Sequence, residues 1–343
     1  MTRTLIYFFR KSNPIYFSIE KLFNKISAEI SEAHFPEFAV EICQMPFASK
    51  LGTILRNIRY ARKHQASINH ITGDVHYAVL GCSSKNINIL TIHDCVSLHR
   101  YPPKSLRHRF IQTLWYKLPV KKADAITVIS ENTKKDLIHF TNCDPAKIKV
   151  ITNFVDPAFG PSAFSFNKTN PRILFIGTTQ NKNLERFVES LKNICAELEI
   201  VGPLDEKQTQ LLKTNKIKFH QCANLSDEEM IQKYRGCDIL AFPSTYEGFG
   251  LPIIEAQAVG RPVLTSDLSP MREVAGTGAC LINPEDPLSM EKGLTRIIND
   301  DAFRQKLIEE GFVNVKRFRL ETIVNEYISL YRSLHEKKKS VPR

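Results

Sequence analysis

The chain has 343 residues, of which 43% are apolar and 24% are charged, and a formal net charge of +11. This length suits two domains of ordinary size, the composition is that of a soluble globular protein, and no run approaches the roughly 20 apolar residues of a membrane-spanning helix. The eight cysteines are scattered, without a C-x-x-C pair or zinc-ligand spacing. We therefore expect free thiols, a reduced cytoplasmic location and no structural metal.

The positive charge is concentrated in the first half of the chain. Residues 1–165 contain 22 Lys and Arg against 12 Asp and Glu, whereas residues 166–343 contain 25 against 24. An anionic partner is therefore expected for the first half. A membrane surface, a phosphorylated acceptor and nucleic acid all meet that description.

Short β-branched or aromatic runs alternate with longer helical patterns along the chain, which predicts parallel sheets of α/β type. In the first half the predicted strands are Thr4–Phe8, Ala39–Ile42, Ile87–Ile92, Ala125–Ile129 and Ile148–Thr152. In the second half they are Ile173–Ile176, Leu198–Val201, Ile217–Phe219, Ile239–Phe242 and Pro262–Thr265.

The segment from Lys104 to Lys122 predicts an amphipathic helix with cationic flanks, among them Arg107 and Arg109. One interpretation is a core-packed helix with a solvated basic face, and the other is association with anionic lipid. A second basic run at residues 56–63 favours a larger positive surface. Peripheral contact with an anionic surface, such as the inner membrane face, is one partner that this pattern allows.

A linker rich in proline and small polar residues runs from Asp156 to Pro171. It predicts a first domain over residues 1–160 and a second over residues 168–318. A C-terminal helix over residues 320–336, apolar at helical spacing, is expected to rejoin the first domain.

The most informative stretch lies between the last predicted strands. A strand is followed by a loop containing Gly248 and Gly250, and then by Pro252 at the expected first helical position. The glycines let the backbone approach a ligand, and free N–H groups at a helix start suit phosphate oxygens. Glu247 and Glu255 can accept paired hydrogen bonds from the vicinal hydroxyls of sugars and ribose.

Both carboxylates are expected at the C-terminal edge of a parallel sheet, where ligands of open α/β folds bind. Glu255 is predicted in the first helical turn, where the helix dipole favours negative charge. The alternative is that Glu255 is only a favourable first-turn acid and Glu247 a solvated loop acid.

Residues 242–260 resemble the E-x7-E signature of retaining glycosyltransferases of family 4, and the similarity extends over roughly residues 88–335. The resemblance implies the GT-B fold, in which two Rossmann-like α/β domains face each other across a deep cleft. It also implies transfer of a hexose from a UDP- or GDP-sugar, bound by the C-terminal domain, with retention of anomeric configuration. The acceptor, bound by the N-terminal domain, would be a glycan or a lipid-linked saccharide in cell-envelope polysaccharide synthesis.

By this resemblance Glu247 holds hydroxyls of the donor sugar and Glu255 holds the ribose hydroxyls. The backbone that approaches the sugar and diphosphate belongs to Gly248, Phe249, Gly250 and Leu251. The nucleotide base is expected to meet the backbone of residues 222–225, which end at Leu225.

The predicted strand Ile173–Ile176 runs into a polar loop that contains Gly177, Thr178 and Lys182. A lysine at a strand end can neutralise a diphosphate leaving group without a metal, and Lys182 matches the lysine of the family. Thr178 stands where the family has an arginine. Either another residue supplies that charge or the leaving group is held less tightly.

Residues 91–94 resemble the histidine segment of the family's N-terminal domain, which makes His93 a third catalytic candidate beside Glu247 and Lys182. The alternative is a buried structural histidine. His70 and His76 frame another polar strand end, as acceptor ligands or as parts of a hydrogen-bonded turn.

The family's glycine loop after the first strand is replaced by residues 10–14, Arg-Lys-Ser-Asn-Pro. Arg10 and Lys11 either substitute for it or bind the acceptor. No Asp-x-Asp motif follows a strand, so no metal cofactor is expected, only the nucleotide-sugar co-substrate.

Three other classes of protein compete with a transferase. A nicotinamide dehydrogenase lacks support because no G-x-G-x-x-G follows an early strand. A nucleic-acid partner would explain the charge but not the donor-like loop, so none is expected. A non-catalytic nucleotide-sugar-binding protein stays open as the alternative.

Overall fold

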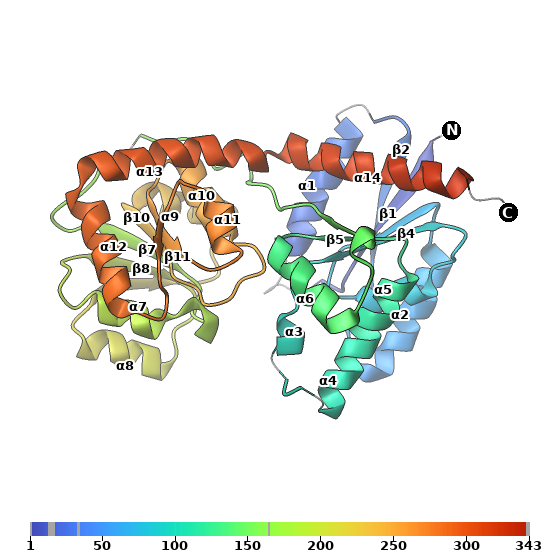
Figure 1. Cartoon of the computed structure of the whole chain (residues 1–343), viewed down its shortest axis with the longest axis horizontal. Coiled ribbons are helices and arrows are strands. Elements are labelled where there is room, and N and C mark those ends of the chain that lie inside the picture. The colour runs from blue at the N-terminus through green and yellow to red at the C-terminus, as the bar shows by residue number, and fades with distance from the viewer. Residues whose placement is uncertain are drawn as a thin grey trace. The chain divides into compact units, whose positions relative to one another are not determined.

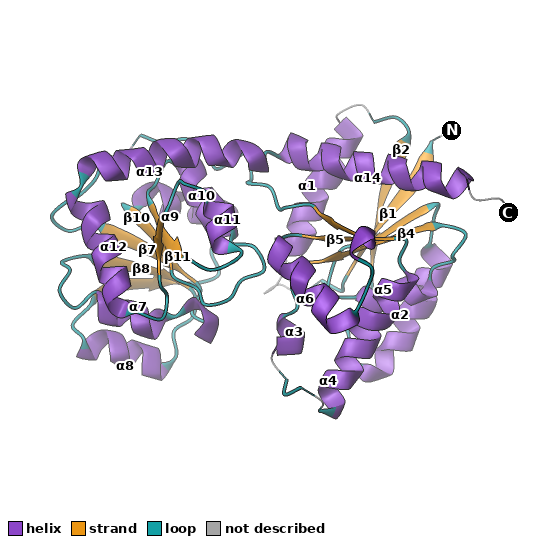
Figure 2. Ribbon diagram, viewed as in Figure 1, coloured by secondary structure: helices purple, strands orange, loops and turns teal. Residues whose placement is uncertain are grey.

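The computed structural model describes residues 2–12, 18–32, 35–99, 101–103, 105–163 and 165–340. The chain divides into two compact units, which we call unit 1 (residues 1–154 and 320–343) and unit 2 (residues 155–319). Over the described residues each unit is built on one six-stranded parallel sheet with helices on both faces (Figure 1, Figure 2).

The division between the units falls a few residues before the predicted end of the first domain at residue 160. Unit 2 begins at Val155, whose N–H donates to the carbonyl of Phe318, 2.9 Å away. Phe159 packs edge-on against Tyr234, with ring centroids 5.3 Å apart. The start of the linker is therefore held by unit 2.

Unit 1 has the strand order β2-β1-β3-β4-β5-β6. Its strands are β1 (Arg3–Phe9), β2 (Phe38–Gln44), β3 (Ile68–Ile71), β4 (Ile87–Ile92), β5 (Ala125–Val128) and β6 (Ile148–Val150). Its helices are α1 (Ser18–Glu32), α2 (Leu51–His64), α3 (Val96–His99), α4 (Leu106–Ile111), α5 (Leu118–Lys122), α6 (Glu131–Thr141) and α14 (Leu320–Ser340). A wider helical turn over Gln112–Lys117 joins α4 to α5.

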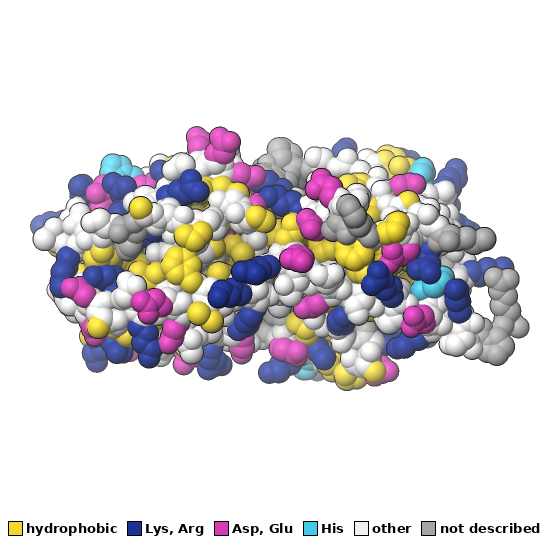
Figure 3. All heavy atoms as spheres, turned by 90° about the horizontal axis from the view of Figure 1, so that it is seen from above, with side chains coloured by type: hydrophobic (Ala, Val, Ile, Leu, Met, Phe, Trp, Pro, Cys, Tyr) yellow, Lys and Arg dark blue, Asp and Glu magenta, His cyan; other side chains and the backbone are white. Residues whose placement is uncertain are grey.

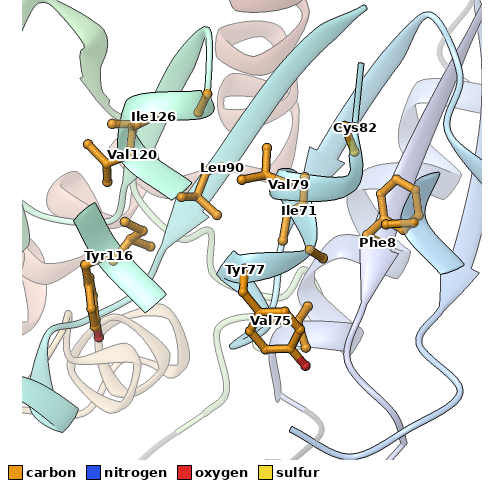
Figure 4. Close-up of a cluster of buried hydrophobic side chains, with 14 of the residues drawn as sticks. Phe8, Ile71, Val75, Tyr77, Val79, Cys82, Leu90, Tyr116, Val120 and Ile126 are labelled. Carbon is orange, nitrogen blue, oxygen red and sulfur yellow. The ribbon is translucent and has the colours of Figure 1, made fainter. Parts of the chain in front are cut away.

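Alternate residues of β1 enter two different cores, because successive side chains of a strand point to opposite faces. Leu5 and Tyr7 join a cluster that includes apolar residues of α1 and α14, so the C-terminal helix is part of unit 1. Ile6 and Phe8 join the cluster on the other face, part of which Figure 4 shows. A strand that is apolar on both faces therefore forms the middle of a layered sheet.

Unit 2 has the strand order β12-β11-β10-β7-β8-β9. Its strands are β7 (Arg172–Ile176), β8 (Glu197–Val201), β9 (Lys218–Cys222), β10 (Ile239–Phe242), β11 (Val263–Ser266) and β12 (Cys280–Ile282). Its helices are α7 (Leu184–Ser190), α8 (Glu206–Thr214), α9 (Asp227–Gly236), α10 (Leu251–Val259), α11 (Met271–Ala275), α12 (Pro287–Asn299) and α13 (Asp301–Asn314).

All ten predicted strands are present, and their ends differ from the predicted ones by at most three residues. Strands β3 and β12 were not among them. The sequence of β3 is Ile-Asn-His-Ile, and its two polar side chains are fully buried, which hides the strand from an apolar pattern. Strand β12 has only three residues, too few for a pattern to show.

In each sheet, the order in which the chain adds strands changes direction at one strand. In unit 1 the chain adds β2 on one side of β1 and then β3 on the other side, and in unit 2 it adds β8 and β10 on opposite sides of β7. Ligands of open α/β sheets bind at the carboxyl ends of the strands at such a switch point. Ligands are therefore expected at the loops after β7 and β10 in unit 2, and after β1 and β3 in unit 1.

Over the described residues, none of the helices combines the length and apolar character needed to cross a bilayer. All eight cysteines are free thiols.

Unit 2 contains a buried arginine that donates hydrogen bonds to several backbone carbonyls. Arg261 is 1% exposed, and its guanidinium donates to backbone carbonyls, including those of Cys237, Arg235 and Val259. It also donates to the hydroxyl of Ser162, which fastens the linker to the unit.

We expect Arg261→Met to destabilise unit 2 by about 3 kcal/mol, because several buried carbonyls lose their donors at once. Such a loss lowers the unfolding temperature of a unit of this size by about 6–12 °C in scanning calorimetry. The control is Arg272→Met, since Arg272 is half exposed and forms a surface ion pair with Asp267, so its loss should cost less than about 1 kcal/mol. Equal effects of the two changes would contradict this account of Arg261.

Candidate functional site

The two loops at the switch point of unit 2 meet through an ion pair. The ammonium of Lys182, from the loop after β7, donates to Glu247 Oε1, from the loop after β10, at 2.5 Å. The two side chains are 18% and 16% exposed, and the Lys182 ammonium lies 4.5 Å from the ring centroid of Phe242. A partly buried charge pair thus stands where the topology places ligands.

Gly177 makes room for this lysine. Its φ of +87° lies in the left-handed region that favours glycine. A Cβ built on it would come within 2.8 Å of Lys182 Cε. The lysine side chain therefore runs directly over the glycine backbone on its way to Glu247.

Asn181 joins the same two loops and was not singled out by sequence reasoning. Its amide nitrogen donates to the carbonyl of Tyr246 at 3.0 Å and to Glu247 Oε1 at 3.4 Å. Its own carbonyl accepts from the N–H of Thr245 at 2.8 Å. An asparagine in a polar loop is too common in sequences to reveal such a bridge.

The loop after β10 ends in a helix start that is open to a ligand. Gly250, with φ +115°, is the N-cap residue of α10, and no side chain caps this end. Leu251 is the first helical residue and Pro252 the second, one position later than predicted. Helix N–H groups that lack a partner favour phosphate oxygens.

Glu255 is not in the first helical turn, contrary to the sequence prediction. Glu255 is the fifth residue of α10, because the helix begins at Leu251. The effect of the helix dipole falls off after the first turn, so the dipole stabilises the Glu255 carboxylate less than predicted. Its carboxylate is held by a neighbour instead. The hydroxyl of Tyr234, which is 0% exposed, donates to Glu255 Oε2 at 2.5 Å.

The other predicted donor residues of unit 2 lie around this edge. The hydroxyl of Thr178 donates to the carbonyl of Pro203 at 2.5 Å, so that side chain is turned toward the neighbouring loop. Phe249 is buried and packs edge-on against Phe318, and Gly248 precedes it in the loop between Glu247 and α10. Leu225, just before α9, is half-buried.

A further cation of unit 2 follows the Lys182 loop at the start of α7. Arg186, on α7, donates to Asn183 Oδ1 at 3.1 Å. Together with Asn181 and Thr245 it lines a polar cavity of about 530 Å³.

Unit 1 carries the remaining predicted residues. Arg10, directly after β1, donates to both carboxylate oxygens of Glu20 at 2.7 and 3.2 Å, and Lys11 is exposed.

Half-buried His93, directly after β4, donates through Nε2 to the carbonyl of Thr72 at 2.9 Å, and burial lowers its pKa. Burial therefore favours the neutral form of the His93 imidazole. Asn13 and Pro14 of the predicted loop, and Lys104, lie outside the described residues.

Two residues predicted to bind the acceptor, His70 and His76, are buried inside unit 1, and their burial corrects the sequence interpretation. His70 is fully buried, with Nδ1 2.8 Å from the hydroxyl of Tyr331 and Nε2 2.6 Å from that of Thr91, and burial lowers its pKa to about 3. His76 is 4% exposed, bonds the carbonyl of Trp115, and has its pKa lowered by burial to about 4. Neither ring reaches solvent to meet an acceptor.

Comparison with known families agrees with this geometry over most of the chain. Residues 161–338 match the family model described as glycosyl transferases group 1, and residues 32–159 match the one described as glycosyltransferase family 4. The chain belongs to the glycosyl transferases group 1 family. This confirms the resemblance inferred from the segment around Glu247 and Glu255.

Curated relatives share about a quarter of their aligned residues with this group 1 chain. The O-antigen chain mannosyltransferase RfbU of Salmonella typhimurium is 26% identical over 233 residues, which is 64% of each chain. The serotype-specific mannosyltransferase WbdA of Escherichia coli is 24% identical over 222 residues, 58% of this chain and 27% of that protein. The match therefore spans less than two thirds of either relative.

Solved structures similar to this group 1 chain have the same fold. Sucrose-phosphate synthase from Thermosynechococcus elongatus has a TM-score of 0.80 at 16% identity, covering 98% of this chain and 100% of that one. HepE of Anabaena, in complex with UDP and glucose, has a TM-score of 0.75 at 15% identity, covering 96% and 100%. Identities this low concern the fold alone, which is of GT-B type with two parallel α/β units.

Proposed function

We propose that this group 1 chain transfers a hexose from a nucleoside-diphosphate sugar to a hydroxyl of a glycan or lipid-linked acceptor, with retention of configuration. The observation that carries the proposal is the Lys182–Glu247 pair at the switch point of unit 2, beside the uncapped start of α10. Hydroxyls of the sugar would bond Glu247, and the diphosphate would lie between the Lys182 ammonium and the N–H groups of α10.

In the proposed step, the bond between the anomeric carbon and the β-phosphate oxygen breaks. A bond from the same carbon to the acceptor oxygen forms on the same face of the sugar, and the acceptor proton passes to the departing phosphate. The nucleoside diphosphate leaves in protonated form, and negative charge develops on its phosphate oxygen only until that proton arrives. Lys182 can stabilise the departing phosphate because it is a fixed cation beside the position where the negative charge develops. Arg186 is a second cation beside the same loop.

The relatives narrow the choice of substrates to try first. RfbU and WbdA are named as mannosyltransferases, the former of the O-antigen chain. We therefore propose a role in cell-surface polysaccharide synthesis and GDP-mannose as the first donor, followed by UDP-glucose. Neither donor is expected to require a metal ion.

The test is phosphorus and proton NMR of donor consumption by the full chain, with and without saccharide acceptors and with EDTA present. The proposal predicts release of one nucleoside diphosphate, an unchanged anomeric configuration in the product, and activity that survives EDTA. Tight binding of a nucleotide sugar without any consumption would favour the non-catalytic binding protein instead. Inverted configuration would contradict the retaining step.

Tyr234 offers a prediction about the ribose end of the site. If Glu255 accepts from the ribose hydroxyls, then Tyr234→Phe frees a carboxylate oxygen that the tyrosine now fixes. We expect affinity for ribonucleoside diphosphates to fall about tenfold, the effect of losing one hydrogen bond to a charged group. The preference over 2′-deoxynucleoside diphosphates should shrink in parallel.

Isothermal titration with matched ribo and deoxy ligands measures both quantities. An unchanged preference in Tyr234→Phe would contradict the positioning role of the tyrosine. Absence of any preference in the wild type would contradict the assignment of Glu255 itself.

A further inference from the structure

Two helical segments of unit 1 carry basic residues without any acidic ones. Helix α2 and the helical segment from Leu106 to Lys122 together contain nine Lys and Arg and no Asp or Glu. The rest of residues 1–165 holds 13 basic residues against 12 acidic ones. The positive charge of the first half is therefore gathered on these two segments.

The face of the molecule shown in Figure 3 mixes the two signs. On the face shown in Figure 3, Lys and Arg side chains are interspersed with Asp and Glu. In this respect α2 and residues 106–122, which lack acids, differ from that face.

The same segments expose large apolar side chains. Leu51 and Leu55 of α2 are 75% and 65% exposed, and Leu106 of α4 is 86% exposed. Phe110, one turn after Leu106, is 39% exposed. Exposed apolar groups of this size, gathered rather than scattered, mark an interaction surface.

Helical spacing places the apolar and basic groups on one side of α2. Leu51, Leu55 and Arg59 are four residues apart and share a face, whereas Ile54, Asn57 and Ala61 are the buried residues on the other face. The exposed stripe thus begins with leucines at the start of the helix and continues with arginine.

Helices α2 and α4 contribute to a single surface. Leu51 and Ile54 line a largely apolar cavity of about 680 Å³ together with Arg107, Phe110 and Ile111. In Figure 1 the two helices also lie beside each other in unit 1. We call the exposed set Leu51, Leu55, Leu106 and Phe110, with Arg56, Arg59, Arg107 and Arg109, the α2–α4 face.

We propose that the α2–α4 face docks on the surface of a bilayer that contains anionic lipid, with the leucines and Phe110 entering the interface and the arginines lying among the headgroups. Positive charge complements the anionic headgroups, and exposed leucines gain by leaving water for the acyl boundary. The inference goes beyond the proposed function and does not depend on the donor chemistry.

Nucleic acid fits this surface less well, because backbone phosphates attract the arginines but offer nothing to exposed leucines. Each helix of the face combines two exposed apolar side chains with two arginines, which is typical of an interfacial helix.

The experiment is sedimentation of the full chain with vesicles of phosphatidylcholine alone or of phosphatidylcholine mixed with phosphatidylglycerol. We expect binding to the mixed vesicles, weakening as salt is raised, and little binding to the neutral ones. The double variant Leu51→Ser, Leu106→Ser keeps every charge and should bind mixed vesicles at least tenfold more weakly. The double variant Arg56→Gln, Arg107→Gln keeps the leucines and should lose most of the dependence on phosphatidylglycerol.

The matched control is Leu288→Ser, which removes a leucine of unit 2 that is 53% exposed and should change nothing. Circular dichroism checks that each variant is folded, which we expect because the substituted leucines are exposed. No binding of the folded wild type to mixed vesicles would overturn the proposal. Undiminished binding of the leucine variant would overturn it as well, since charge alone would then account for the attraction.

Discussion

A Glu247→Gln variant is expected to transfer sugar at about a hundredth to a thousandth of the wild-type rate. The change keeps the size of the side chain but removes its charge, and with it the ion pair to Lys182. Charge placed beside a reacting centre in a site partly shielded from water is worth far more than the same charge in solution. The fold should be unaffected, because the Asn181 bridge can bond an amide oxygen as well as a carboxylate.

Initial rates with a saturating nucleotide sugar measure this effect, and circular dichroism confirms folding. The control is Glu206→Gln, an exposed acid of the same unit, which should leave the rate unchanged. A Glu247→Gln variant with more than a third of wild-type activity would remove Glu247 from the catalytic set.

A Lys182→Met variant should lose a similar factor, about a hundredfold in rate, for a different reason. Its ammonium is the fixed cation at the expected position of the departing diphosphate. We expect weaker binding of the nucleoside diphosphate but unchanged binding of the corresponding nucleoside, because only the phosphates should contact the lysine. The matched control is Lys306→Met, since the side chain of Lys306 is 69% exposed on α13.

Rates and titrations with both ligands separate the two contributions. Combined with Glu247→Gln, the lysine change should cost less than the sum of the single effects, because each removes the same ion pair. Full additivity, or equal loss of nucleoside and diphosphate binding, would contradict the assigned role of Lys182.

The sequence pattern was sufficient for the parts of the fold that are apolar and regular. Strands such as β1 and β10 are apolar on both faces, and a parallel sheet requires that. The Glu247 loop stood out because its glycines, proline and carboxylates have a joint explanation only at a ligand site. Confirmation of the family then came from the comparisons.

Contacts between distant side chains could not be predicted in the same way. Asn181 and Tyr234 act through partners 66 and 21 positions away, and no local pattern marks either residue. His70 and His76 appeared as polar groups at a strand end, yet the structure uses them as buried hydrogen-bonding groups. A histidine at a strand end looks the same in sequence whether it faces the core or the solvent.

Thermal unfolding of the full chain with UDP, GDP, ADP, TDP and CMP, for the wild type and Glu255→Ala, tests the donor site most directly. A ligand that binds only the folded protein stabilises it by about 2.7 kcal/mol at a hundredfold excess over its dissociation constant. The account predicts that UDP or GDP raises the unfolding temperature of the wild type and does so much less in the variant. No rise with any nucleotide, or an equal rise in both proteins, would contradict the donor site at β7 and β10.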